Sequence, residues 1–427
     1  MTPFSRRIAA ACCGVCVGVA WTPHPASAGR WLGSLEAGYE SYSERYSIAD
    51  DDTLSSVDEF RTRARVAYTV GLLGRNYSLF EARAMLGESG WDAAARAFLT
   101  RRFGSTARHI ASLDAEVTRR GYREGSTYEF PNDYTRATAR AGLRGRVHPS
   151  LTLRFDDRVE WLDYDQPTEF DYDYLKNSIW GAVDIARDPT RGVIAGVRHT
   201  TFTVPDSTEI EYRAVIPFVE VRSFDDLHQQ VLVTASAERR RYPDFGTRSS
   251  FWAFVVLAAF EFPLHPHWSV EMIDDLEDYA YDEETGAYHD YVENNAVLLV
   301  NYNTRNVQIG LGPAFGWLNS EASPDDEYRE LGVRLALELF GGSDWWVSAN
   351  YEPGLRDYAA YKDGDVITNA EVVFSDYAYH RVGLFANARI ARALWLNVFL
   401  DYQPEDHERE ADDATATIAS VGLTLTL

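Results

Sequence analysis

The sequence predicts an all-β fold: a transmembrane antiparallel up-and-down β-barrel of about 18–20 strands, and of an even number. Three observations predict it. Apolar and polar residues alternate at period two along almost the whole chain, as in strands with one apolar and one wet face. Long acidic loops alternate with tight turns between these strands. After residue 28, no apolar run reaches the roughly 18 to 20 residues that a membrane-spanning helix needs.

The segment 60–70 shows the alternation clearly. Its even-numbered residues are mostly apolar, and its odd-numbered residues include Arg61, Arg63 and Arg65. The same pattern recurs in the segments 136–144, 153–161, 330–339 and 394–401. The apolar face would point inward in a soluble sandwich and outward in a membrane barrel, so alternation alone leaves both folds open.

Connection lengths distinguish the two folds. The long loops are expected at 47–58, 122–133, 163–173, 282–290, 319–327 and 403–413. The tight turns are expected at 74–76, 148–150, 188–192, 263–267, 304–306, 341–344 and 391–393. Long and short connections alternate along the chain in this way when one end of a barrel faces the periplasm and the other faces the exterior. The segment 354–375 is either one long loop or an additional hairpin.

The N-terminal segment 1–28 has the features of a removable export signal. Arg6 and Arg7 precede an apolar stretch, and the small residues Ala26, Ser27 and Ala28 end it. A twin-arginine signal and a lipoprotein signal are two weaker alternatives. All three cysteines lie in this segment, so the mature chain, residues 29–427, carries none. We expect it to form a single barrel domain.

The last segment, 417–427, places Val421, Leu423, Leu425 and Leu427 on one face and ends on an apolar residue. A terminal strand of this kind must pair with the first strand to close the sheet edge. This last strand, the cleavage site of the export signal and the alternation of long and short connections together resemble bacterial outer-membrane β-barrels. The assembly signal of those barrels usually ends in Phe, whereas this chain ends in Leu427. The narrower resemblance is to porin-like barrels associated with exopolysaccharide export. It implies an outer-membrane location, with lipid and the barrel-assembly machinery as partners.

Arginines gather on the polar face of the predicted strands. Between residues 55 and 160 there are 18 arginines and no lysine. Those expected to point into the lumen are Arg61, Arg63, Arg65, Arg136, Arg140, Arg144, Arg154 and Arg158. Guanidinium groups stay charged in confined spaces and grip carboxylates or phosphates in pairs. The alternative is that they pair with inward acids such as Asp156, Glu160, Glu330 and Glu338 in a salt-bridge network, and both remain open.

The opposite wall is expected to be neutral or acidic. Its predicted inward residues are Asn295, Asn301, Gln308, Glu330, Glu338, Asn397 and Asp401. The loop acids are interpreted as a solvated rim rather than a Ca²⁺ site, because none has a calcium-loop spacing. Aromatic residues make up 13% of the chain, enough for two rings at the membrane surfaces.

The function predicted from these features is a porin-like channel that passes anionic or sugar-type solutes by diffusion. The alternative is a structural or docking barrel of a polysaccharide export or secretion assembly. Because a wide barrel is not filled by its own side chains, a loop must narrow it. The candidate is 354–375, with Tyr358, Tyr361 and Asp365 at the constriction.

Enzymatic, metal and cofactor chemistry is not predicted. His199, His228, His289 and His407 occur without a nucleophile motif, and no phosphate-binding glycine loop is present. Without the signal, 39 basic and 65 acidic residues leave a net charge of −26, which argues against nucleic acid as a partner. A monomer and a homo-oligomer are equally compatible with the sequence.

Overall fold

The computed structural model shows a closed antiparallel barrel of twenty strands. It describes residues 29–48, 51–71, 76–104, 108–123, 132–168, 171–186, 188, 190–205, 207–225, 229–243, 248–284, 288–321, 323, 326–359, 375–408 and 413–427. The strands are β1 (Arg30–Ile48), β2 (Asp51–Gly71), β3 (Tyr77–Gly87), β4 (Gly90–Phe103), β5 (His109–Tyr122), β6 (Tyr134–His148), β7 (Leu151–Tyr164), β8 (Tyr174–Ala186), β9 (Arg191–Thr203), β10 (Tyr212–Asp225), β11 (Gln229–Arg241), β12 (Phe251–His265), β13 (Trp268–Tyr281), β14 (Tyr291–Asn303), β15 (Val307–Asn319), β16 (Tyr328–Phe340), β17 (Trp345–Tyr358), β18 (Tyr377–Ala391), β19 (Leu394–His407) and β20 (Ala414–Thr426). A short 3₁₀ turn, η1 (Thr208–Ile210), precedes β10.

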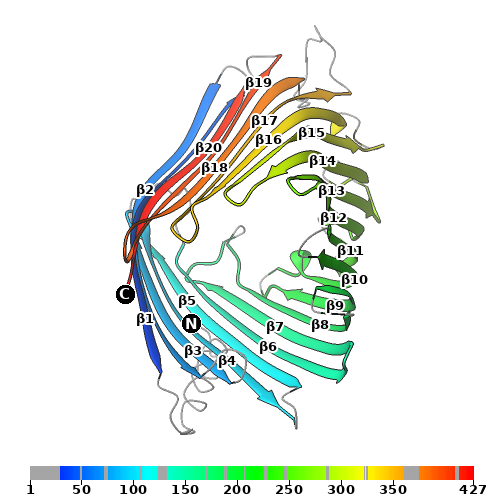
Figure 1. The fold of residues 1–427 in the computed structure, drawn as a ribbon. Coiled ribbons are helices and arrows are strands. Elements are labelled where there is room, and N and C mark those ends of the chain that lie inside the picture. The colour runs from blue at the N-terminus through cyan, green and yellow to red at the C-terminus, as the bar shows by residue number, and fades with distance from the viewer. Residues whose placement is uncertain are drawn as a thin grey trace.

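The barrel closes between its first and last strands. Every strand pairs with its neighbours in the chain, and β1 pairs antiparallel with both β2 and β20. In the β1–β20 pairing, Gly38 lies opposite Gly422. Figure 1 shows the strands following one another around a ring until the blue β1 meets the red β20. This closure leaves no open sheet edge. The all-β barrel predicted from the sequence is therefore confirmed, at the upper end of the predicted strand count.

One predicted loop is wrong. Residues 51–58, placed in a long loop at 47–58, belong to β2 and pair with the end of β1, from Ser41 opposite Asp58 to Ile48 opposite Asp51. Ser and Asp are depleted in strands, so the local composition indicates a loop, but ladder pairing within the hairpin outweighs that preference. Strand β19 likewise continues to His407, past the predicted loop start at 403.

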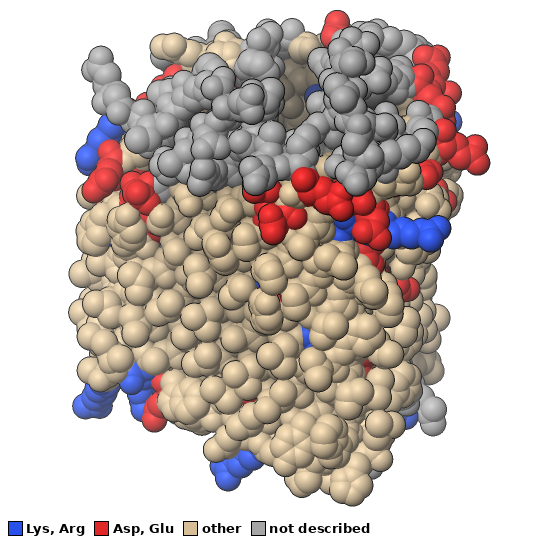
Figure 2. Space-filling model, turned by 90° about the horizontal axis from the view of Figure 1, so that it is seen from above, with Lys and Arg blue, Asp and Glu red and all other residues tan. Residues whose placement is uncertain are grey.

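The outer face of the barrel is apolar. Val66, Leu143 and Leu335 are half exposed on strands whose arginines point the other way. Figure 2 shows, on the face in view, a broad band almost free of charge between acidic residues along one edge and basic residues along the other. Such a band matches the hydrocarbon layer of a membrane. Within the described part of the chain, no helix has the length and apolar character to cross a bilayer.

The two ends of the barrel differ. Turns of two residues join β6 to β7, β12 to β13 and β18 to β19, and both terminal strands begin or end on the same side as these turns. The long connections lie at the other end, which also carries the two-residue connections β1–β2 and β3–β4 and which we assign to the cell exterior. Outward aromatics gather at the periplasmic end, where Trp31 packs on Tyr68 at 4.7 Å and Trp268 on Tyr302 at 5.1 Å between ring centroids.

A repeated polar cap secures the extracellular strand ends. The side chain directly before a returning strand accepts a hydrogen bond from a backbone N–H where the outgoing strand ends. Asp133 accepts from Tyr122 at 2.7 Å, and Asp290 from Tyr281 at 2.6 Å. The other caps are Asp173, Glu211, Ser250, Glu327, Asp376 and Asp413. Each cap accepts a hydrogen bond from a backbone N–H group at the end of a strand, where the hydrogen bonds between strands stop. Part of the predicted acidic rim therefore consists of strand caps.

An aromatic residue follows most of these caps and begins the strand. The residues are Tyr134, Tyr174, Tyr212, Phe251, Tyr291, Tyr328 and Tyr377, which we call the aromatic collar. By alternation along each strand they share the lumen face with the arginines. Tyr212 stacks on Phe202 at 5.1 Å, and Tyr291 on Tyr279 at 4.9 Å. Part of the aromatic content assigned to the membrane surfaces thus lines the extracellular mouth from within.

Acid is expected to loosen two extracellular connections. Arg119 donates to Asp165 and Arg239 to Asp282, each over 2.8 Å from Nη1 to Oδ1, and these hydrogen bonds lower the pKa of both carboxyls. Stabilisation from a lowered pKa is complete above the unfolded value of about 3.9 and is lost as the pH falls through the folded value. Amide hydrogen exchange at residues 165 and 282, corrected for intrinsic rates, should therefore rise between pH 6 and pH 3.

The matched variant is Asp282→Asn. It should show raised exchange at residue 282 already at pH 6, with little further change on acidification, while residue 165 keeps the wild-type pH dependence. Identical profiles in wild type and variant would show that the Arg239 contact does not hold this connection.

Candidate functional site

All eight arginines predicted for the lumen lie on the lumen face, and each is in contact with at least one carboxylate. Arg61 contacts Glu40 and Glu59, Arg63 contacts Glu36, Arg65 contacts Glu81, Arg136 and Arg158 contact Glu160, Arg140 contacts Asp156, and Arg144 and Arg154 contact Asp184. The salt-bridge alternative describes this wall better than a row of free cations. Some of these arginines share a carboxylate: Arg136 and Arg158 both contact Glu160, and Arg144 and Arg154 both contact Asp184.

Two pairs of arginines face each other directly across the β6–β7 ladder. Arg140 lies opposite Arg158, and Arg144 opposite Arg154, with the Gly142 and Asp156 row between them. Like charges in directly opposite positions destabilise a sheet. The carboxylates present are shared rather than matched one to one, since Glu160 serves both Arg136 and Arg158. Concentrated positive charge of this kind is characteristic of an anion-binding surface.

Two adjoining cavities of about 320 Å³ and 370 Å³ open on the Arg140–Arg158 pair, which lines both. We call them the twin cavities. Their charged lining consists of the cations Arg96, Arg136, Arg140, Arg158, Lys176 and Arg198 and the acids Asp114, Glu116, Asp156 and Glu160. Six cations against four acids leave an excess of two positive charges. The side chains of Arg140 and Arg158 are 56% and 52% exposed, so both reach the solvent of the lumen.

The second cavity adds features that sequence reasoning missed. Lys176 and Arg198 line it, and neither forms an ion pair with a carboxylate among the residues that the structure describes. Trp180, directly opposite Arg198 on the β8–β9 ladder, offers an aromatic face in the same cavity. Tyr174 of the aromatic collar donates to Glu160 at 2.7 Å and so positions the acid shared by two arginines. The period-two pattern over 174–186 could have revealed Lys176 and Trp180.

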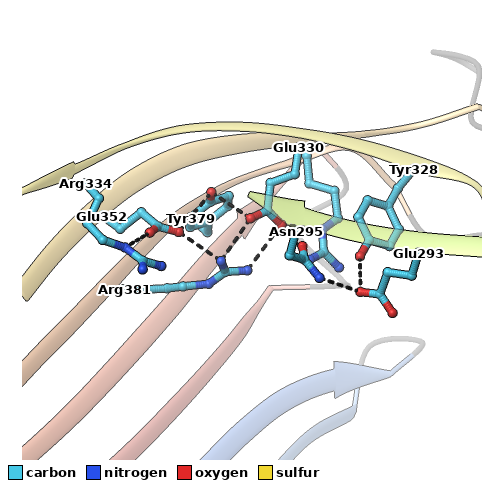
Figure 3. A network of polar contacts seen from close by, with 9 residues as sticks. Glu293, Asn295, Tyr328, Glu330, Arg334, Glu352, Tyr379 and Arg381 are labelled. Carbon is cyan, nitrogen blue, oxygen red and sulfur yellow. Dashed lines mark hydrogen bonds and ion pairs between the residues drawn. The ribbon is translucent and has the colours of Figure 1, made fainter. Parts of the chain in front are cut away.

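A second polar network occupies the lumen face of β16, β17 and β18 (Figure 3). Glu330 at its centre accepts from Arg356 at 2.6 Å, from Arg381 at 2.9 Å and from the Tyr379 hydroxyl at 2.9 Å. Arg381 also donates to Glu352 at 3.0 Å. Glu330, Glu352 and Tyr379 are all buried. This network, which we call the Glu330 network, is a brace rather than an open site.

The neutral or acidic wall predicted opposite the arginines is therefore only partly right. Asn301 and Gln308 do line a lumen cavity of about 330 Å³, but Arg334 lies there beside Glu338. Glu330 is surrounded by guanidinium groups. The expectation considered Glu330 without the arginines of the neighbouring strands, and the register places Arg356 of β17 directly opposite Glu330.

The predicted constriction is mostly untested. Tyr358 is the last residue of β17, and its backbone N–H donates to Asp376 at 2.6 Å, so this residue belongs to the barrel wall. Tyr361 and Asp365 lie outside the described residues. Neither an inward fold of 354–375 nor its role stands as more than a prediction.

One arrangement resembles a nucleophile relay in its connectivity. Ser375 Oγ lies 3.1 Å from His407 Nδ1, and His407 Nε2 lies 3.5 Å from Glu405. Ser375 has 0% exposure, however, so no substrate reaches its hydroxyl. Its place beside the Asp376 cap indicates a structural contact. Among the described residues, no group of three or more His, Cys, Asp or Glu is placed to hold a metal ion.

Solved structures with a similar fold include receptors and a transporter. The siderophore receptor PirA from Pseudomonas aeruginosa matches with a TM-score of 0.53 and 11% identity over 95% of this chain and 82% of its own. The copper transporter OprC matches with a TM-score of 0.56 and 10% identity over 94% of this chain and 80% of its own. The alcaligin outer-membrane receptor FauA from Bordetella pertussis matches with a TM-score of 0.52 and 11% identity over 92% of this chain and 76% of its own. No family model and no curated protein matches the sequence.

The chain is a bacterial outer-membrane β-barrel. The architecture that it shares with these neighbours is the large closed barrel of outer-membrane receptors, and identities near 10% show the fold alone. The location predicted from the sequence is confirmed. The narrower resemblance to barrels of exopolysaccharide export finds no support, since these neighbours are receptors and a transporter.

The predicted function is wrong in its mechanism. A porin-like channel for passive diffusion, and the alternative of a docking barrel for an export assembly, are contradicted by neighbours described as siderophore receptors and a copper transporter. The lumen explains the error. The sequence shows many arginines on one face of the strands, which suggests an open conduit lined by positive charge. In the structure, acids on the same and neighbouring strands form ion pairs with these arginines, and two cavities lie among the paired groups.

Proposed function

We propose that this barrel is an outer-membrane uptake receptor that binds a small anionic organic solute in the twin cavities. The observation that carries the proposal is the Arg140–Arg158 pair, two like charges held opposite each other and exposed to both cavities. A ligand carboxylate between them would relieve their repulsion and accept paired hydrogen bonds from each planar fork. The proposal takes 1–28 as an export signal and 29–427 as one barrel.

The rest of the cavity lining supports an anion with a flat or ring-shaped body. Lys176 and Arg198 supply further donors, and Trp180 an apolar face on which a sugar or aromatic ring can stack. Uptake of such a ligand involves binding and release without a covalent step, so no catalytic group is needed. The saccharide solutes expected from the sequence fit only if they are acidic.

The neighbours have two kinds of cargo, siderophores and copper. A lining with more cations than acids repels a bare metal cation and attracts an anionic chelate. Of the two cargoes, we therefore favour the siderophore type, a small organic chelate.

Isothermal titration calorimetry on the purified full-length barrel in detergent tests the proposal. The probes are citrate and glucuronate, with glucose as the neutral match to glucuronate. We expect both anions to bind, glucose to bind at least about tenfold more weakly, and affinity for the anions to fall as NaCl is raised. Equal binding of glucose and glucuronate, or no binding of either anion, contradicts the proposal.

A further inference from the structure

A second cationic cluster lies in the lumen on the periplasmic side of the twin cavities. At its centre is Asp184, a carboxylate with 1% of its side chain exposed. Arg154 contacts its Oδ2, Arg144 Nη2 lies 3.7 Å from the same oxygen, and Arg222 Nη2 lies 3.5 Å from Oδ1. We call these four residues the Asp184 cluster. None of them lines the twin cavities.

The fold assembles this cluster from four strands. Arg144 on β6 lies opposite Arg154 on β7, Asp184 follows on β8, and Arg222 reaches over from β10. On β9, Gly192 lies opposite Arg222 and Ala186, so no side chain stands in that row between β8 and β10. Arg144 lies four positions after Arg140 along β6, which is about 13 Å at roughly 3.3 Å per residue.

Charge is not balanced in this cluster. Three guanidinium groups share Asp184, and among the described residues the other carboxylate in contact is Glu220, 3.6 Å from Arg222. One positive charge is therefore left over. Like charges opposite each other, as at Arg144 and Arg154, are unfavourable in a sheet unless an anion joins them.

Hydrogen bonding is also incomplete. The Nε groups of Arg154 and Arg222 are buried donors, and neither has a hydrogen-bond partner among the described residues. Buried polar groups are nearly always paired, so unpaired ones call for a ligand or a water molecule. The cluster is open on one side, since 52% of the Arg144 side chain is exposed to the lumen.

We propose that the Asp184 cluster binds a multivalent oxyanion of the phosphate type. Arg144, Arg154 and Arg222 would bind its oxygens, and Asp184 is the internal carboxylate that holds the guanidinium groups together when the oxyanion is absent. Tetrahedral oxyanions offer enough oxygens for three planar forks, which a single carboxylate does not. This site does not depend on the proposed function, because its residues are separate from the twin cavities.

Calorimetry with inorganic phosphate tests this site on the full-length barrel in detergent. The background is R140Q/R158Q, which removes the twin cavities as a competing anion site. In it, Arg154→Gln and Arg222→Gln should each weaken phosphate binding at least about tenfold, as expected for loss of a charge-assisted hydrogen bond. Asp184→Asn removes the internal anion and should strengthen binding about tenfold. Arg65→Gln, a lumen arginine paired with Glu81, is the matched control and should change nothing.

Folding of each variant is checked by its heat-dependent mobility in gels. If Asp184→Asn does not fold, Glu220→Gln takes its place with the same expected direction. Absence of phosphate binding in the background protein, or equal affinities in the arginine variants and the Arg65 control, overturns the proposal. Failure of citrate and glucuronate to bind the wild type, with phosphate binding intact, would contradict the proposed function alone.

Discussion

Replacing Glu330 with Gln is expected to lower the free energy of unfolding by about 3 kcal/mol, because removing one member of a buried ion pair leaves its partners uncompensated. Glu330 is buried and accepts from Arg356 and Arg381 within 2.9 Å. Arg381 keeps Glu352 in the variant, but Arg356 has no second carboxylate among the described residues. Guanidinium chloride unfolding in detergent, followed by tryptophan fluorescence, measures the loss.

Glu338→Gln is the matched control. Glu338 lies on the same strand and the same lumen face, and no ion pair to it is formed within the described residues. Its replacement should change stability by no more than about 0.5 kcal/mol. A loss for Glu330→Gln as small as that of the control would mean that the Glu330 network does not brace the β16–β18 wall.

Alternation and loop lengths predict the barrel well because they are local properties of a strand. The side chains of β2 alternate whatever strands lie beside it, so Arg61, Arg63 and Arg65 are placed in the lumen from the sequence alone. Residues 51–58 are missed because their composition favours a loop, and only pairing with β1 makes them a strand.

The partners of each arginine are not predictable in the same way, because they depend on register between strands. Asp184 and Arg222 lie on β8 and β10, with a whole strand between them, and nothing in either segment points to the other. The extracellular caps are different. An acid followed by an aromatic residue, as in Asp133 with Tyr134 and Asp290 with Tyr291, recurs at strand starts and is visible in the sequence.

The caps, the aromatic collar and the twin cavities form one connected structure. Asp173 caps the end of β7, Tyr174 beside it begins β8, and its hydroxyl holds Glu160. Glu160 in turn contacts Arg136 and Arg158 in the cavities. A fixed carboxylate keeps both guanidinium groups oriented, which lowers the entropy that a ligand must remove on binding. The extracellular mouth therefore positions the proposed binding site.

The double replacement Arg140→Gln and Arg158→Gln is expected to weaken binding of citrate or glucuronate at least about a hundredfold. Each side chain supplies a charge-assisted hydrogen bond of about 1.5–3 kcal/mol, and the two act on one ligand. The double variant removes the repulsion between the two arginines, but it leaves the buried carboxylate of Asp156 without its Arg140 partner. Asp156→Asn in the same protein removes that charge, so the triple variant should keep a stability near the wild-type value, which separates a binding defect from a folding defect.

Calorimetry with both anions measures this effect, and Arg65→Gln controls for the loss of a lumen charge away from the cavities. Asp156 is left without Arg140 in the double variant, so its carboxylate adds a negative charge that opposes an incoming anion. Adding Asp156→Asn should recover part of the lost affinity, because it removes the repulsion between the Asp156 carboxylate and the anion. The recovery should be partial, because the guanidinium donors of Arg140 and Arg158 are still missing. An Arg140/Arg158 variant that binds both anions as tightly as the Arg65 control would place the anion site elsewhere in the lumen.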